Sequence, residues 1–401
     1  MSRHSSIKTT LSSDIKSHAS PSNIKSQISN IQSPRVAIVA DWLIGGGAER
    51  VVYELHRLYP DAQIYTSYCN KKSRAQFKDA DIRVSYMQRF PLSKLYKFLP
   101  ILREHWFENV NLKEFDLIIS ASGAEAKGIK NIKPSALHIN YCHSPTHYYW
   151  VRYYEYLQNP GFGIFDPIAR IGIKLLLESR QRWDYRAAQR PKYIIANSNC
   201  VKDRIEQIYN RDSEVIFPPV DTKRFHSNIK YQISNIKRSG FVIAGRQTPY
   251  KRIDLAVAAC TKAGLPLTVI GDGPEHKKLK KMAGPTISFK TNVSDGEISK
   301  YFQEASAFIF PNEDDFGITP VEAMAAGTPV IALKAGGALD YVIPGKTGEF
   351  FTKQNADSLA DVLTNFDASK YDSEKIIAHA KNFSVEAFHK NIGQFVNSKL
   401  K

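Results

Sequence analysis

Cysteine is scarce in this chain of 401 residues, with only Cys69, Cys142, Cys200 and Cys260, which lie far apart along the sequence. This spacing offers no C-x-x-C pair for a zinc site and no framework of disulfides. Long apolar runs are also missing, because no stretch reaches the roughly 18 to 20 apolar residues of a membrane-spanning helix. The polar N-terminus lacks the apolar core of a signal peptide. We therefore expect a cytoplasmic protein, free in solution or peripheral at the inner face of the plasma membrane.

Acidic residues are outnumbered, 39 against 55 basic ones, which gives a formal net charge of +16. Such an excess favours an anionic partner, whether nucleic acid, a membrane surface or a phosphorylated substrate. The basic residues are spread along the chain, and no RRM, KH, zinc-finger or helix-turn-helix signature is present. We therefore expect no nucleic-acid partner and weigh the other two.

The chain divides by composition into a tail and a long folded part. Residues 1–33, rich in Ser, Lys, Ile and Asn, predict a disordered tail. Residues 22–33 recur at 227–238 with nine of twelve positions identical, and we assign this repeat no function. From residue 35 onward, short β-branched runs alternate with helical stretches, which predicts parallel βαβ units.

Two series of strands are expected, and they indicate an α/β protein with two doubly wound, Rossmann-like domains. The first series comprises residues 35–40, 63–65, 117–120, 138–142 and 193–196, with a helix over 48–58. The second comprises residues 241–244, 267–270, 287–289, 307–310 and 330–333. Pro218 and Pro219 form the natural hinge. The expected divisions are a first domain over 34–217, a second over 218–383, and a C-terminal helix over 384–401 that packs back toward the first domain.

A glycine-rich loop, Asp-Trp-Leu-Ile-Gly-Gly-Gly-Ala-Glu-Arg at 41–50, separates the first strand from its helix. Glycines let the backbone approach a ligand closely, and a helix start offers free N–H groups to an anion. The loop lacks the G-x-G-x-x-G spacing and a P-loop lysine, so a tight turn without a ligand explains it equally well.

Two cations follow the strand at 241–244. Arg246 comes directly after Gly245, and Lys251 lies five residues further on. A guanidinium fork and an ammonium at the carboxyl end of a strand suit the two phosphates of a nucleoside diphosphate. Two solvated charges on a loop are the alternative.

The strongest motif is Pro-Asn-Glu-Asp-Asp-Phe-Gly-Ile-Thr-Pro-Val-Glu at 311–322, followed by Ala-Met-Ala-Ala-Gly. Thr319 and Pro320 predict the N-cap and first position of a helix, with Glu322 completing a capping box. That helix start would present N–H groups to a phosphate, while Asp314 and Glu322 accept hydrogen bonds from sugar hydroxyls. Neighbouring acidic side chains are expected to be solvated and not a metal site.

Taken together, four motifs resemble glycosyltransferase family 4. They are Gly-Gly-Gly-Ala-Glu-Arg at 45–50, Gly-Arg-x4-Lys at 245–251, Gly-Asp-Gly-Pro at 271–274, and Asp-x7-Glu at 314–322. The segments at 141–145, 183–184, 196–198 and 218–221 further resemble bacterial mannosyltransferases that build O-antigen or exopolysaccharide. The family implies a GT-B fold, in which two Rossmann-like doubly wound domains face each other across a cleft. It also implies retaining, nucleotide-sugar-dependent transfer. Asp314 departs from the usual Glu of the family, and its shorter side chain has less reach toward the donor sugar.

The resemblance also implies roles for individual residues. Arg246 and Lys251 would bind the diphosphate, Asp314 the donor sugar and Glu322 the ribose. His143 would approach the donor sugar from the first domain. The other expected contacts are Gly46, Gly47, Phe316, Gly317, Ile318 and Thr319 by backbone, with Val293 and Asp295 at the base. A carboxylate at position 295 suits the N1/N2 edge of guanine.

The implied enzyme is a hexosyltransferase that most readily uses mannose from GDP-mannose, with no metal and no further cofactor, in cell-surface polysaccharide (lipopolysaccharide) synthesis. A UDP-sugar-dependent enzyme of the same fold and a silent nucleotide- or glycan-binding relative are the alternatives. The acceptor is expected to be a glycan or a lipid-linked oligosaccharide. Residues 89–107 and 171–177 mix basic and apolar side chains, which fits contact with an anionic membrane and equally fits helices packed in the core.

Overall fold

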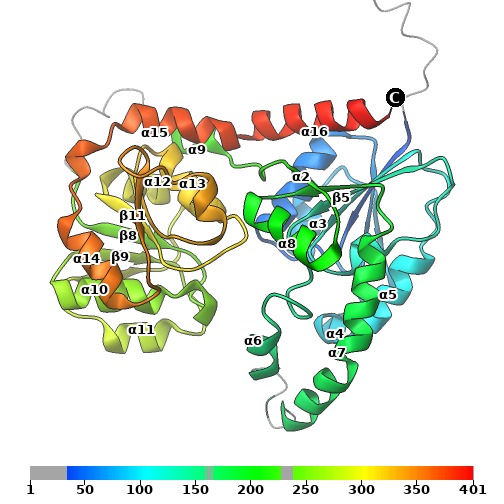
Figure 1. Ribbon diagram of the computed structural model, residues 1–401, viewed down its shortest axis with the longest axis horizontal. Helices are drawn as coiled ribbons and strands as arrows, with labels where there is room; N and C mark the ends of the chain where they lie inside the picture. Colours follow the sequence, from blue (N-terminus) through cyan, green and yellow to red (C-terminus); the bar gives the residue numbers. More distant parts are fainter. Residues whose placement is uncertain (1–33, 159, 161–162, 164–165, 227–237, 401) are drawn as a thin grey trace, which may run out of the picture. The chain divides into compact units, whose positions relative to one another are not determined.

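The computed structural model describes residues 34–158, 160, 163, 166–226 and 238–400 (Figure 1). The expected disordered tail over 1–33, which holds the first copy of the repeat, lies outside the described residues. Residues 227–237, nearly all of the second copy, also lie outside them.

The first sheet has seven parallel strands in the order β3-β2-β1-β4-β5-β6-β7. Its strands are β1 (Val36–Ala40), β2 (Gln63–Thr66), β3 (Ile82–Val84), β4 (Leu117–Ser122), β5 (Leu137–Cys142), β6 (Tyr193–Ala196) and β7 (Glu214–Val215). The second sheet has six parallel strands in the order β10-β9-β8-β11-β12-β13. These are β8 (Phe241–Ala244), β9 (Leu267–Ile270), β10 (Ile287–Lys290), β11 (Ala307–Phe310), β12 (Val330–Leu333) and β13 (Gly348–Phe351). The expected α/β class with two doubly wound sheets is confirmed.

Helices connect the strands, as parallel pairing requires. Along the first sheet they are α2 (Gly47–Leu58), α3 (Lys71–Gln76), α4 (Leu92–Leu95), α5 (Pro100–Asn109), α6 (Tyr153–Gln158), α7 (Asp166–Ala188) and α8 (Asn199–Tyr209). Along the second they are α9 (Thr222–His226), α10 (Ile253–Ala263), α11 (His276–Met282), α12 (Asp295–Glu304), α13 (Ile318–Ala325), α14 (Ala356–Asn365) and α15 (Ser373–Ala380). The last helix, α16 (Val385–Lys399), ends the described chain.

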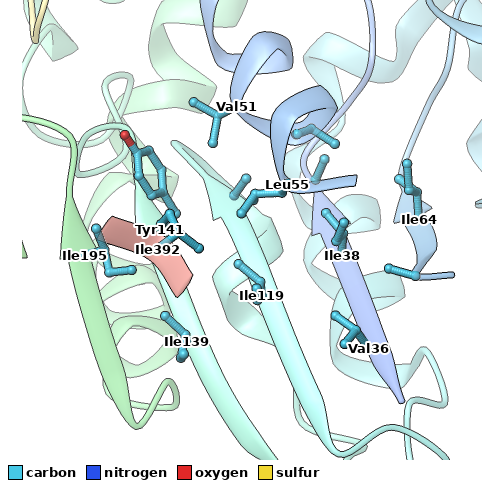
Figure 2. Packing of buried hydrophobic residues seen from close by; sticks show 14 of the residues in the cluster. Val36, Ile38, Val51, Leu55, Ile64, Ile119, Ile139, Tyr141, Ile195 and Ile392 are labelled. Carbon is cyan, nitrogen blue, oxygen red and sulfur yellow. The ribbon is translucent and has the colours of Figure 1, made fainter. Parts of the chain in front are cut away.

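Buried aliphatic side chains hold the first sheet to its helices. Figure 2 shows Ile38 and Ile119 on neighbouring strands facing Val51 and Leu55 of α2. The C-terminal helix α16 adds Phe388, Ile392, Phe395 and Val396 to this same cluster. Each such side chain contributes about 1.5–3 kcal/mol when fully buried, so α16 belongs energetically to the core of the first sheet.

The chain passes from the first sheet to the second near Pro218 and returns before α16. The two passages are tied together, because the Val220 N–H donates to the carbonyl of Phe383 at 2.9 Å. Within the described part of the chain, no helix is both long and apolar enough to cross a membrane. In a parallel sheet all loops that follow strands emerge at one edge, which is where a ligand site is expected.

Candidate active site

A cavity of about 740 Å³ opens where loops from both sheets converge. The first sheet contributes residues that follow β1, β4 and β5, including Asp41, Gly123 and His143. The second contributes residues that follow β8 and β11, including Lys251 and the stretch 314–319. Its volume is typical of sites for small ligands.

The second-sheet wall of the cavity is the start of α13. Gly317 is the N-cap with φ 84°, and a side chain there would place Cβ 2.7 Å from Phe310 Cζ. Only glycine meets both conditions without strain. Ile318 and Thr319 line the cavity, and their N–H groups, in the first turn of the helix, have no acceptor within it. They form a donor site suited to an anion.

The expected cap of this helix is wrong by two residues. Thr319 lies inside the first turn, no side chain caps the helix, and Glu322 therefore takes no part in a capping box. A capping box does occur at the start of α12, between Ser294 and Glu297. The helix begins earlier than expected because the chain turns at Gly317, whose φ is positive, and not at Thr319.

One cation faces the α13 N-terminus. Lys251 Nζ lies 2.5 Å from Asp314 Oδ2, and both residues line the cavity. Arg246 is exposed at the end of β8, and the described residues that line the cavity do not include it. The structure thus places Lys251 and Asp314 together and leaves the Arg246 side chain outside.

The first-sheet wall is the start of α2. Gly46 is the N-cap with φ 125°, and Gly47 begins the helix and lines the cavity. A Cβ at Gly47 would lie 3.0 Å from Ile318 Cδ1, so two helix N-termini approach each other here. Glu49 folds back to accept a hydrogen bond from the Gly45 N–H at 2.6 Å.

Asp41 is a cavity residue that the sequence analysis did not single out. It is buried and accepts hydrogen bonds from the N–H groups of Gly123 at 2.8 Å and Ala126 at 2.7 Å. Burial, helped by the charge of Glu125, raises the pKa of Asp41 to about 6 despite these bonds. The sequence could have indicated Asp41 by its position directly after β1, because ligands of parallel α/β sheets bind at the carboxyl ends of the strands.

His143 follows β5 and lines the cavity. Burial lowers the pKa of His143 to about 4, although the charge of Asp315 acts in the opposite direction. The imidazole is therefore neutral at physiological pH. A neutral ring can exchange hydrogen bonds with a sugar hydroxyl without adding charge.

The acidic loop is not solvated as expected. Asp315 accepts from Arg204 Nη1 at 2.6 Å and lies 2.8 Å from His147 Nε2, and both partners belong to the first domain. Burial by itself would raise the pKa of Asp315, but His147 and Arg204 outweigh it and hold that pKa below its ordinary value. Glu313 is more exposed and still pairs with the second nitrogen of Arg204 at 2.6 Å. These contacts join side chains from distant parts of the sequence, so local pattern could not reveal them.

Glu322 also has a partner from the first domain, since Arg50 Nη1 donates to its Oε1 at 2.9 Å. Phe316 is buried among aromatic rings, and Val293 packs against the core of the second sheet. Asp295 is the first residue of α12. In the described part of the chain, no three His, Cys, Asp or Glu side chains gather as a metal-binding group.

Two sequence families match successive parts of the chain. Residues 45–224 match Glycosyltransferase Family 4, and residues 227–383 match Glycosyl transferases group 1. The O-antigen chain mannosyltransferase RfbU of Salmonella typhimurium is 27% identical over 50% of this chain and 62% of its own length. A GDP-mannose-dependent alpha-mannosyltransferase of Mycolicibacterium smegmatis is 36% identical over 27% of this chain and 28% of its own. The chain thus spans less than two thirds of these curated relatives.

Solved structures share the fold across nearly the whole chain. HepE from Anabaena, solved with UDP, superposes with a TM-score of 0.63 at 18% identity, covering 91% of this chain and 100% of its own. Sucrose-phosphate synthase from Thermosynechococcus elongatus gives 0.66 at 17% identity, covering 91% and 98%. The two successive family matches, together with the two doubly wound sheets, show that this chain belongs to the group 1 glycosyltransferases of family 4 and has their GT-B fold.

Proposed function

We propose that this protein is a retaining glycosyltransferase that moves mannose from GDP-mannose to a glycan or lipid-linked saccharide during cell-surface polysaccharide synthesis. The observation that carries the proposal is that Lys251 and the uncapped start of α13 line the same cavity. A cation beside a helix N-terminus is the arrangement that a diphosphate requires.

The family resemblance implies a binding role for each residue, and the place of Lys251, Asp314 and residues 316–319 in the cavity wall supports it. Lys251 and the N–H groups of Ile318 and Thr319 receive the diphosphate, while Asp314 holds a hydroxyl of the donor sugar. Glu322 takes the ribose once Arg50 has released it. The loop that begins α12, with Val293 and Asp295, receives the base, and Gly46 and Gly47 let the first domain approach. Arg246 reaches the diphosphate when the site closes on the donor.

The chemical step breaks the bond between the anomeric carbon and the diphosphate oxygen. The acceptor hydroxyl oxygen bonds to that carbon on the same face, and its proton passes to a departing phosphate oxygen. Negative charge grows on the diphosphate as the bond breaks, so fixed positive groups around it lower the barrier. Neutral His143 supplies hydrogen bonding to the donor sugar from the opposite wall.

Mannose from GDP-mannose is favoured by two lines of support. The first is that the relatives include an O-antigen chain mannosyltransferase and four mannosyltransferases named for GDP-mannose. The second is the carboxylate residue at the start of α12, a residue type that suits guanine. The basic excess of the chain further favours peripheral contact with the anionic inner leaflet.

Thermal unfolding of the purified protein with GDP, UDP or ADP tests the nucleotide site. A ligand present at 100 times its Kd adds about 2.7 kcal/mol to stability. We expect protection by GDP alone, lost in Lys251→Ala and weakened in Arg246→Ala, with Lys277→Ala on α11 as an unaffected control. Protection by UDP alone would move the donor to a UDP-sugar. The absence of protection by any nucleotide contradicts the proposed site.

A further inference from the structure

A second cavity, of about 350 Å³, lies beside the first and has apolar walls. Its walls come from α5, from the inner side of α7, and from the segment that precedes α5; they include Leu99, Leu102, Ile173 and Leu177. Figure 1 shows α5 and α7 running side by side, and an ion pair between Arg180 and Glu104 joins them. A ready-made apolar cavity of this size is a binding site for an apolar group.

The two cavities meet at a common wall. Tyr148 and Tyr156 line both of them. Tyr148 is fixed from behind, because its hydroxyl contacts the buried ion pair of Arg103 and Glu125. One ligand that passes these two rings would therefore place an apolar part in the second cavity and a polar part beside His143.

The outer side of the same elements is also apolar. Among the described residues, eleven of the sixteen exposed large apolar side chains fall within 86–101 and 154–176. Four of them lie on α7. Leu176 borders the cavity, and positions 168, 171 and 175 form one stripe of the helix with exposed fractions of 70%, 61% and 77%. With its inner side lining the cavity, this half of α7 is apolar around most of its circumference, apart from the side that carries Arg170 and Lys174. An apolar surface this wide suits cover by lipid or by another protein.

Charge around this face decides between those two surroundings. Residues 89–101 carry three basic residues and no acidic one. Exposed Arg89 and Lys94 flank Phe90, which is 75% exposed, and Arg170 and Lys174 flank the stripe on α7. Apolar side chains ringed by basic ones complement the anionic surface of a phospholipid bilayer.

We infer that the acceptor is a lipid-linked saccharide whose hydrocarbon chain occupies the cavity between α5 and α7. The face formed by residues 86–101 and 166–176 rests on an anionic membrane, so the hydrocarbon chain of the acceptor enters the cavity from the bilayer. The saccharide then reaches past Tyr148 and Tyr156 to the donor. This inference rests on the proposed transfer reaction and specifies its acceptor class.

The chain site is tested by comparing n-dodecyl α-mannoside, below its micelle concentration, with methyl α-mannoside in calorimetric titrations in the presence of GDP. Each buried methylene strengthens binding roughly fourfold, so four of them give a preference of about a hundredfold or more. Gly172→Phe should abolish the preference, because a Cβ at Gly172 meets open space beside the cavity. Gly393→Phe, on α16 with equally open space, is the matched control.

Retained GDP protection shows that Gly172→Phe is folded, and Ala169→Leu gives a second, smaller obstruction of the same cavity. Equal binding of the two mannosides overturns the inference. A preference for the dodecyl mannoside that survives in both variants overturns it too. If no nucleotide protects the wild type while the preference for the dodecyl mannoside holds, the proposed reaction fails and the hydrocarbon site between α5 and α7 stands.

The membrane face is tested by co-sedimentation with phosphatidylglycerol and phosphatidylcholine vesicles. We expect binding to the anionic vesicles only, lost in the double variant Ile171→Asp with Leu175→Asp. Leu339→Asp, at a side chain 52% exposed on another surface, should bind as the wild type does. Failure to bind anionic vesicles, together with no chain preference, overturns the lipid assignment in favour of a protein partner.

Discussion

Acid should destabilise this protein through His143, and replacing that side chain by Gln should remove about 2 kcal/mol of the loss at pH 5. The pKa of His143 is lowered to about 4 by burial, from an ordinary value of 6.5. As the pH falls from 6.5 toward 4, His143 binds a proton in the unfolded chain but not in the folded protein. The contribution of this residue is therefore fully present above pH 6.5 and is lost progressively below it.

The size of the stability loss follows from the difference between the pH and the ordinary pKa of histidine. One pH unit within this window costs about 1.4 kcal/mol, so at pH 5, 1.5 units below the ordinary pKa, the loss is about 2 kcal/mol. His138 has its pKa lowered to about 3 by burial and adds a similar loss. That loss is common to the wild type and to His143→Gln, so the difference between the two proteins isolates His143.

Urea unfolding at pH 7.5 and pH 5.0 measures this difference, with the denaturant slope checked for constancy. His105→Gln is the control, since His105 is exposed on α5. We expect the loss between the two pH values to shrink by about 2 kcal/mol in His143→Gln and to stay unchanged in the control. Equal losses in wild type and His143→Gln would refute the claim that this imidazole is held neutral.

Three further substitutions probe the contacts between the two domains and the turn before α13. Asp315→Asn removes the carboxylate that holds two first-domain side chains, and urea unfolding should register a loss of about 3 kcal/mol. Gly317→Ala forces an alanine into a φ of 84° and places its Cβ 2.7 Å from Phe310 Cζ. The same assay should therefore show a loss of about 2–4 kcal/mol in the free energy of unfolding. Arg50→Ala leaves Glu322 free for the ribose, and calorimetry should show tighter GDP binding than in the wild type. Unchanged stability in the first two, or weaker GDP binding in the third, would contradict these assignments.

Local pattern was sufficient for the architecture. Five expected strands, at 193–196, 241–244, 267–270, 307–310 and 330–333, coincide with observed ones at both ends, because a β-branched run between turn residues defines its own limits. Three strands were missed, β3, β7 and β13. The first two are very short, and β13 begins at Gly348, where a Cβ would lie 1.8 Å from the carbonyl oxygen of Val330. Packing against β12, and not intrinsic propensity, selects that strand.

The sequence by itself also determined the family and the second-sheet wall of the cavity, since Gly317, Ile318 and Thr319 are adjacent in the chain and form one helix start. Tertiary structure decided what faces that wall. Arg50 meets Glu322, and His147 meets Asp315, although each pair is widely separated in the sequence. Periodicity reports only on neighbours along an element, so it could not pair these side chains, and it could not reveal that α5 and α7 enclose an apolar cavity. Those features arise because parallel strands bring distant loops to one edge, where burial and charge act between residues that the sequence keeps far apart.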